Sequence, residues 1–184
     1  MKSTNKKLKL HLACGPHIVD GWDNLDILKD KGIIRHDLRK PLPYKDNSVD
    51  LIFHEHFIEH LTKLEAEAFL RDCYRVLKPG GAMRIGWPDL KRLINAYVLR
   101  NKKYMDYVAP HLEDHRYGYN WDESFSDLLF GWEHRYAYTA KHLMKVLESA
   151  GFQNVKTEKQ GQSGFDIALD FRKDPATTYI EVVK

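Results

Sequence analysis

Short apolar runs separated by turn residues dominate the first third of this chain. They cover residues 8–14, 22–28, 33–38 and 49–53, and each run ends at a glycine, proline or polar residue. Apolar runs of this length, bounded by turn residues, are typical of buried strands. The pattern therefore predicts four strands in this part of the chain.

Two later segments carry apolar residues at helical spacing. The first runs from Thr62 to Leu77, where Thr62 followed by Glu65 forms a capping-box pattern. The second covers residues 139–150, and Gly151 follows it as a C-terminal cap. We expect an amphipathic helix over each segment.

The remaining regular segments complete an alternation of strands and helices. Strands are expected at 82–87, 152–158 and 178–183, a helix at 89–101, and a loop at 160–174. Alternating strands and helices indicate an α/β fold with a mostly parallel sheet and helices on both faces. A length of 184 residues suits a single domain over residues 1–184.

Residues 102–138 break this regularity and predict a partly helical insertion over the sheet edge. Aromatic rings among hydrogen-bonding groups suit a sugar or another flat polar ligand, but they also suit a lid or a homodimer contact, which we favour. The aromatic residues considered are Tyr104, Tyr107, Tyr117, Tyr119, Trp121, Phe125, Phe130 and Trp132.

Charge and cysteine content narrow the class of protein. The net charge is +3, and four lysines within the first nine residues supply much of the excess, which favours a solvated tail over a nucleic-acid patch. Cys14 and Cys73 lack disulfide or zinc-site spacing and are expected to be reduced thiols. No apolar window is long enough to span a membrane, so we expect a cytoplasmic protein.

The candidate chemistry lies where the predicted strands end, because ligands of such sheets bind at the carboxyl ends of the strands. Gly15 follows the first strand and permits close approach of a ligand. Asp26 ends the second strand and could accept hydrogen bonds from ribose hydroxyls. Asp37 and Leu38 end the third strand and suit an adenine ring. Taken alone, Gly15 and Asp26 are each more often ordinary turn residues, and Asp37 with Leu38 is a weak signal, but their order along the chain is informative.

In that order, the segments resemble the class I S-adenosylmethionine-dependent methyltransferases, specifically the small methyltransferase-domain proteins. The matching segments are LHLACG at 10–15, WDNLD at 22–26, HDLRKPLPYKDNSVDLIFHEHFIEHL at 36–61, YRVLKPGG at 74–81, WPDL at 87–90 and HRYAYTAKHLMKVLESAGF at 134–152. The resemblance implies a Rossmann-like fold with an antiparallel final strand and S-adenosylmethionine as cofactor.

The resemblance also implies which residues hold the cofactor. The first loop should line its methionine part, Asp26 its ribose, and Asp37 with Leu38 its adenine, while His54 should approach the amino group or the methyl group. The full set of implied cofactor contacts is Ala13, Cys14, Gly15, Asp26, Asp37, Leu38, His54 and Glu55.

Two features depart from the family pattern. The first loop has one glycine where larger relatives have two or three, and only residues 15–21 separate the first two strands. Because a parallel crossover usually needs a dozen or more residues, the first crossover helix should be absent or cut to one turn. A catalytically inactive module for binding or dimerisation therefore stays open as an alternative.

Methyl transfer to a hydroxyl requires removal of a proton, and histidine titrates in a suitable range. His56 and His134 are the candidate bases, and Asp89 either contacts the acceptor or caps its helix. His56 and His60 have the i, i+4 spacing also found in metal sites, but a structural cluster at a helix start is the interpretation we favour, and no metal is expected.

The candidate acceptor contacts are Arg135, Tyr138, Asp170 and Arg172. We predict a methyltransferase that modifies an oxygen or nitrogen of a small polar molecule or glycan unit. A nucleic-acid methyltransferase is disfavoured because HEHF replaces the Asn/Asp-Pro-Pro-Tyr/Phe signature after the fourth strand and no basic stripe is present. An NAD-dependent enzyme is disfavoured because GxGxxG is absent.

Overall fold

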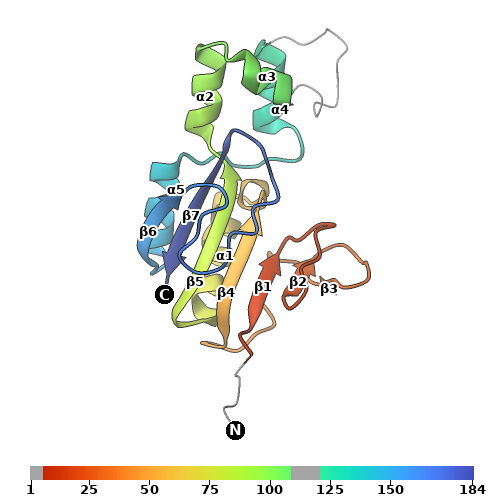
Figure 1. Ribbon diagram of the computed structural model, residues 1–184, viewed down its shortest axis with the longest axis vertical. Coiled ribbons are helices and arrows are strands. Elements are labelled where there is room, and N and C mark those ends of the chain that lie inside the picture. The colour runs from red at the N-terminus through yellow and green to blue at the C-terminus, as the bar shows by residue number, and fades with distance from the viewer. Residues whose placement is uncertain (1–5, 109–120) are drawn as a thin grey trace.

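A computed structural model describes residues 6–108 and 121–184. Within them a seven-stranded sheet has the order β3-β2-β1-β4-β5-β7-β6 (Figure 1). Only β7 is antiparallel to its neighbours β5 and β6. The strands are β1 (Lys9–Leu12), β2 (Asp23–Asp26), β3 (Ile34–Arg35), β4 (Val49–Glu55), β5 (Leu77–Pro88), β6 (Gln153–Glu158) and β7 (Thr177–Val183). The predicted α/β fold with an antiparallel final strand and a helix-free first crossover is confirmed.

Two helices, α1 and α5, cover one face of the sheet and form the main core with it. Strand residues such as Leu12, Ile52 and Ile85 pack there with Leu70 of α1 and Leu143 of α5. The helical elements of the described residues are η1 (Ile58–His60), α1 (Lys63–Val76), α2 (Leu90–Val98), α3 (Lys102–Val108), α4 (Trp121–Phe130) and α5 (Ala140–Ser149). None of the helices described is long and apolar enough to cross a membrane.

The opposite face of the sheet is covered by the loop between β6 and β7 instead of by a helix. Phe165, Ile167 and Phe171 of that loop pack with Leu51 and Phe53 of β4. The connections that could have placed helices here, between β1, β2 and β3, are too short to contain them. The sequence predicts helices on both faces of the sheet. On this second face the long loop, and not a helix, buries the apolar side chains of the strands.

The helices α2, α3 and α4 form a small cluster of their own beyond the carboxyl end of the sheet (Figure 1, top). Its buried members Leu93, Ala96 and Tyr104 pack with Phe125 and Leu128. This cluster includes α3 and α4 of the predicted insertion 102–138, whereas Tyr136 and Tyr138 pack in the main core. Tyr117 and Tyr119 lie outside the described residues.

The start of α1 has the predicted capping box. The Thr62 backbone N–H donates to Glu65 Oε2 at 2.8 Å, and the Glu65 backbone N–H donates to Thr62 Oγ1 at 3.3 Å. We expect Thr62→Ala to lower the free energy of unfolding by about 1 kcal/mol, because one of the first helical N–H groups loses its acceptor. Urea unfolding measures this, with Lys63→Ala, which takes no part in the box, as the control. Equal effects of the two substitutions would contradict it.

Candidate active site

The ends of β1, β2 and β4 meet at the carboxyl edge of the sheet. Leu12 pairs in register with His54, so the loop after β1 and the residues after β4 leave the sheet side by side. Asp26, at the end of β2, is nearly buried and accepts hydrogen bonds from the Gly15 N–H at 2.8 Å and the Leu28 N–H at 3.0 Å. Asp26 thus joins the first loop to the end of the second strand.

This arrangement fits the ribose of a nucleoside cofactor. Each Asp26 carboxylate oxygen accepts one backbone hydrogen bond, which leaves capacity to accept another from a hydroxyl. Gly15 has φ +51°, and a Cβ atom built on it would meet nothing within 4 Å, so the space beside Gly15 is open. The contacts of Ala13, Gly15 and Asp26 with a cofactor stay a prediction, which this geometry permits at Gly15 and Asp26.

The pair predicted to hold adenine, Asp37 and Leu38, is less open. The Asp37 carboxylate accepts two hydrogen bonds from the Arg39 guanidinium, both at 2.9 Å, and this contact lowers the pKa of Asp37 to about 2. Leu38 is buried in the main core. Adenine contacts by these residues stay a prediction.

The predicted cofactor contact of His54 is wrong. Its side chain is 0% exposed and faces Phe57 and Phe69 on the α1 side of the sheet, at ring-centroid distances of 6.1 and 5.3 Å. Successive strand residues point to opposite faces, so His54 projects into the core while its neighbours Phe53 and Glu55 project to the other side. Burial lowers the pKa of His54 to about 3, so its ring is neutral.

Two further predicted cofactor contacts, Cys14 and Glu55, are already engaged within the protein. Cys14 is buried, and burial raises the pKa of its thiol to about 11, which keeps it protonated. Glu55 accepts hydrogen bonds from the Tyr179 hydroxyl and, at 3.1 Å, from the Arg172 backbone N–H. Glu55 therefore anchors the loop before β7 at the sheet edge.

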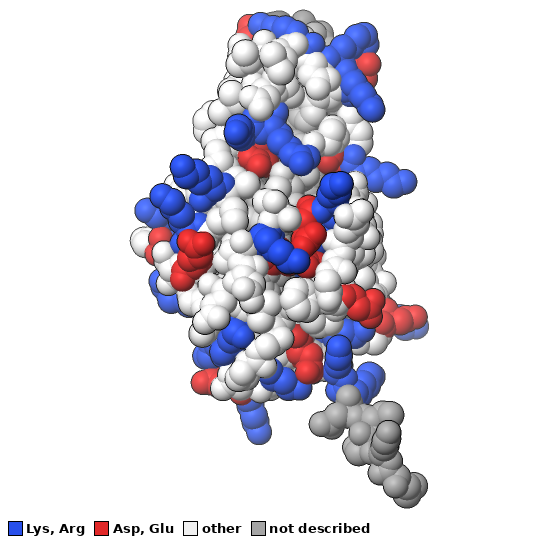
Figure 2. All heavy atoms as spheres, turned by 60° about the vertical axis from the view of Figure 1, so that its left-hand side comes forward, with Lys and Arg blue, Asp and Glu red and all other residues white. Residues whose placement is uncertain are grey.

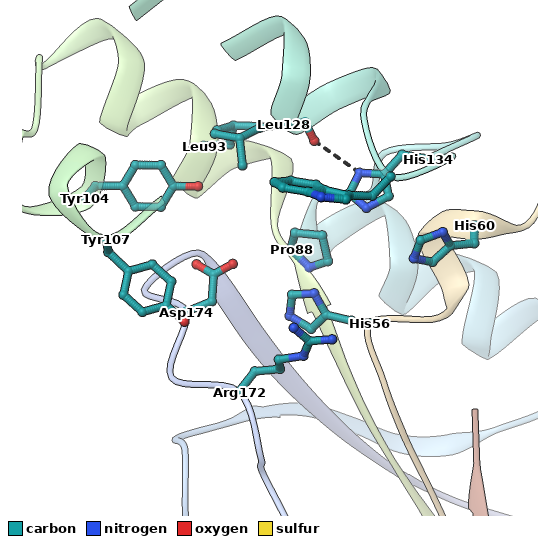
Figure 3. Close-up of a pocket in the computed structure, with 11 residues that line it drawn as sticks. His56, His60, Pro88, Leu93, Tyr104, Tyr107, Leu128, His134, Arg172 and Asp174 are labelled. Carbon is teal, nitrogen blue, oxygen red and sulfur yellow. Dashed lines mark hydrogen bonds between the residues drawn. The ribbon is translucent and has the colours of Figure 1, made fainter. Parts of the chain in front are cut away.

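A cavity of about 360 Å³ opens between this edge and the α2–α4 cluster. Figure 3 shows Tyr104, Tyr107 and Asp174 on one side of it and His60 and His134 on the other. Its lining residues are His56, His60, Pro88, Leu93, Tyr104, Tyr107, Leu128, Trp132, His134, Arg172 and Asp174. Three residues predicted for catalysis or acceptor binding, His56, His134 and Arg172, thus share one cavity.

Three other predicted site residues are engaged elsewhere. Asp89 caps α2 through the Lys91 N–H at 2.8 Å and accepts from the Thr178 hydroxyl at 3.3 Å, so its predicted acceptor contact is wrong. Tyr138 is 1% exposed within the main core, and the Asp170 carboxylate is bound by Arg84 at 2.6 and 2.7 Å. The predicted acceptor contacts of Tyr138 and Asp170 are therefore also wrong.

The fourth, Arg135, has an exposed side chain that does not line the cavity, while its backbone N–H donates to the Glu59 carbonyl at 2.8 Å. Its predicted acceptor contact stays a prediction, and the chain turns at this point to present His134 to the cavity.

Burial controls the charge of the groups beside the cavity. It lowers the pKa of His56 to about 3 and that of His60 to about 4, and it also lowers the pKa of His134. Burial raises the pKa of Glu59 to about 8. The three imidazoles are therefore neutral at physiological pH, and each keeps one unprotonated ring nitrogen that can accept a hydrogen bond or bind a metal.

Some lining residues were not singled out by the sequence. Asp174 lies in the predicted loop, where nothing in the local pattern distinguishes it from a solvated aspartate. The sequence places Tyr104 and Tyr107 in the aromatic insertion, and their i, i+3 spacing would also place both on one side of a helix. The spacing was therefore a usable signal.

Comparison with known proteins identifies a matching family over part of the chain. Residues 23–85 match the model of the methyltransferase domain. Over 56 residues the chain is 39% identical to a probable S-adenosylmethionine-dependent methyltransferase of Mycolicibacterium smegmatis, which covers 30% of this chain and 21% of that protein. The chain thus spans about a fifth of the length of this relative. The resemblance predicted from the sequence is confirmed.

Solved structures of methyltransferases share the fold over almost the whole chain. A methyltransferase from Archaeoglobus fulgidus has a TM-score of 0.59 at 18% identity, covering 98% of this chain and 87% of that chain. A possible histamine N-methyltransferase from Thermotoga maritima has a TM-score of 0.58 at 16% identity, covering 96% and 82%. Phosphoethanolamine N-methyltransferase 2 from Haemonchus contortus, in complex with S-adenosyl-L-methionine, has a TM-score of 0.59 at 14% identity, covering 97% and 48%.

Proposed function

We propose that this chain, with its methyltransferase-domain match and fold, is an S-adenosylmethionine-dependent methyltransferase that modifies an oxygen or nitrogen of a small polar acceptor. The observation that carries the proposal is the cavity beside the carboxyl ends of β4 and β5, next to the edge where Asp26 and Gly15 fit a nucleoside. The family match and the relatives support S-adenosylmethionine as the cofactor. The helices α3 and α4 would then act as a lid over the acceptor.

The lining of the cavity favours a sugar or glycan unit as acceptor. Tyr104, Tyr107 and Trp132 provide aromatic surface, while Arg172 and Asp174 provide hydrogen-bonding groups. Nucleic acid is not favoured by the face in Figure 2, where Lys and Arg side chains are interspersed with Asp and Glu.

In this proposal His56 is the proton acceptor. Its Nε2 lies 2.7 Å from the Thr177 hydroxyl, which can accept from an Nε2–H, so that Nδ1, 3.5 Å from Glu59 Oε1, is the nitrogen that would take the proton. Asp26 holds the ribose and Ala13 to Gly15 the methionine part, which aligns the cofactor with the cavity. When bound, the cofactor would supply an electrophilic methyl group for the acceptor atom and would be released as S-adenosylhomocysteine.

Calorimetric titration with S-adenosylhomocysteine tests the cofactor part of the proposal. We expect saturable one-to-one binding and no binding of NAD, and a positive result would justify an acceptor screen that begins with sugars. An absence of both heat and thermal shift at millimolar S-adenosylhomocysteine would overturn the enzyme proposal in favour of an inactive binding module.

Arg172 provides a test of the acceptor part. Arg172→Ala should raise the KM for the acceptor at least about tenfold, because a hydrogen bond to a charged group contributes about 1.5–3 kcal/mol. Its affinity for S-adenosylhomocysteine should be unchanged. The neighbouring Lys173→Ala is the matched control, because Lys173 is exposed and does not line the cavity. An unchanged KM in Arg172→Ala would place the acceptor elsewhere.

A further inference from the structure

Glu59, His60 and His134 bring three metal-binding side chains together beside the cavity. One ligand atom from each can be chosen so that all lie within 4.8 Å of one another. Glu59 and His60 belong to η1, and His134 belongs to the loop before α5. His60 and His134 also line the cavity, and their ring centroids lie 4.9 Å apart. Two imidazoles and one carboxylate thus converge from segments distant in the sequence.

The Glu59 carboxyl group needs a partner that the surrounding protein does not supply. The residue is 2% exposed, and neither of its carboxyl oxygens has a hydrogen-bond partner within the part of the chain described. The nearest basic atom is His56 Nδ1, 3.5 Å from Glu59 Oε1. Burying a carboxyl group without hydrogen bonds is costly, and a cation at this position would remove the cost.

His134 is oriented as metal-binding histidines usually are. Its Nδ1 lies 3.1 Å from the Leu128 carbonyl oxygen, which can only accept, so Nδ1 carries the proton. Its Nε2 is therefore left with a free lone pair. Donation of the second ring nitrogen to a backbone carbonyl is the common arrangement around metal sites.

Backbone hydrogen bonds hold the two segments together. The Glu59 carbonyl accepts from the N–H groups of Arg135 and Tyr136, at 2.8 and 3.1 Å, and the His134 N–H donates to the Gly131 carbonyl at 3.1 Å. The ligand side chains therefore project from two segments that the backbone holds in place. Their ligand atoms lie within 4.8 Å of one another, and they would have to approach to about 3–3.5 Å to form bonds of about 2.0–2.2 Å to one ion.

We propose that Glu59, His60 and His134 bind one divalent transition-metal ion of the zinc class at the edge of the cavity. Two histidines and one carboxylate are a known ligand set for Zn²⁺ and leave a coordination position open, here towards the cavity. An oxygen of a water or an acceptor hydroxyl could occupy it, where the ion would lower the pKa of that oxygen's proton. The proposal departs from the sequence-based expectation of no metal site.

Titration of the tag-free, chelator-dialysed chain with Co²⁺, followed by visible absorption, tests the site directly. We expect one Co²⁺ per chain, displaced by Zn²⁺ and not by Mg²⁺. Glu59→Gln and His134→Gln should each weaken binding at least about 100-fold, because changes in residues that only orient ligands already cost about 10–100-fold. The matched controls Glu67→Gln and His142→Gln, which remove the same groups from α1 and α5, should bind as the original chain does.

Either of two results would overturn the metal proposal: no saturable Co²⁺ or Zn²⁺ binding, or binding that Glu59→Gln and His134→Gln leave unchanged. Circular dichroism and thermal unfolding without metal check that the variants fold. If Glu59→Gln does not fold, the Co²⁺ affinity of His134→Gln decides the test alone. A chain that binds S-adenosylhomocysteine but no Co²⁺ would remove the metal site and leave the proposed function intact. A chain that binds Co²⁺ through these residues but does not bind S-adenosylhomocysteine would support the metal site and overturn the proposed function.

Discussion

Asp26→Ala should weaken the binding of S-adenosylhomocysteine by about 1–3 kcal/mol, or about 5–150-fold, the usual cost of leaving buried polar groups unpaired. The Asp26 carboxylate is nearly buried at the end of β2, and each of its oxygens can accept one ligand hydroxyl beyond the backbone hydrogen bond it already accepts. Alanine removes both contacts to the ribose and also frees the Gly15 N–H, so the first loop loses its anchor. Calorimetry of the purified variant measures the loss.

Two further variants separate these causes. Asp26→Asn keeps the shape and one acceptor oxygen, so it should bind more tightly than Asp26→Ala and less tightly than the original chain. Asp30→Ala removes an exposed aspartate from the turn after the same strand and should leave binding unchanged. Equal affinity of Asp26→Ala and the original chain would mean that the ligand does not contact β2.

The order of strands and helices could be predicted because each element has its own local signal. The box at Thr62 and Glu65 marks the start of α1, and the alternation of apolar runs with turns marks the strands. The predicted strand boundaries are less accurate where pairing with a neighbouring strand decides them. The strand predicted at 33–38 is only Ile34–Arg35 in the structure. The strand predicted at 82–87 begins at Leu77, before the Pro-Gly-Gly sequence expected to precede it. Strand ends depend on neighbouring strands that no local pattern describes.

The loop between β6 and β7 shows what a local pattern leaves undecided. Phe165, Ile167, Leu169 and Phe171 alternate with more polar residues, a pattern that indicates one buried side of an extended segment. The apolar side chains of this segment do pack against one face of the sheet, but its backbone is irregular, with positive φ at Asp166 and Asp170, and it forms no strand. The alternation indicates that one side of the segment is buried. Only the three-dimensional structure shows that this side packs on the face of the sheet.

In the candidate site, too, some features follow from the local sequence and others depend on the three-dimensional structure. The error at His54 was avoidable, because the period of two along β4 separates Phe53 and Glu55 from Ile52 and His54. The contact between His60 and His134 was not predictable, since it depends on the turn that brings Arg135 and Tyr136 to the Glu59 carbonyl. Strand ends can be located from the sequence, whereas convergence of distant loops cannot.

A second large effect is expected at Arg84, in the centre of β5. Its side chain is 0% exposed, and its five N–H groups donate to five acceptors: both Asp170 oxygens, one Glu181 oxygen, and the carbonyls of Gln162 and Lys159. Four of these acceptors belong to the loop that covers the second face of the sheet. Arg84 therefore fixes that loop to the sheet and neutralises two buried carboxylates.

Arg84→Met should lower the free energy of unfolding by about 3–5 kcal/mol, because it leaves the Asp170 and Glu181 carboxylates buried without their partner. Lys78→Met is the matched control: Lys78 pairs with Asp50 at 2.7 Å, but its side chain is 43% exposed. An exposed pair of this kind contributes about 0–1 kcal/mol. Urea unfolding at neutral pH compares the two variants at equal slope. If both lost the same small free energy, Arg84 would not hold the loop on the sheet, and the second face would depend on the apolar contacts of Phe165, Ile167 and Phe171 alone.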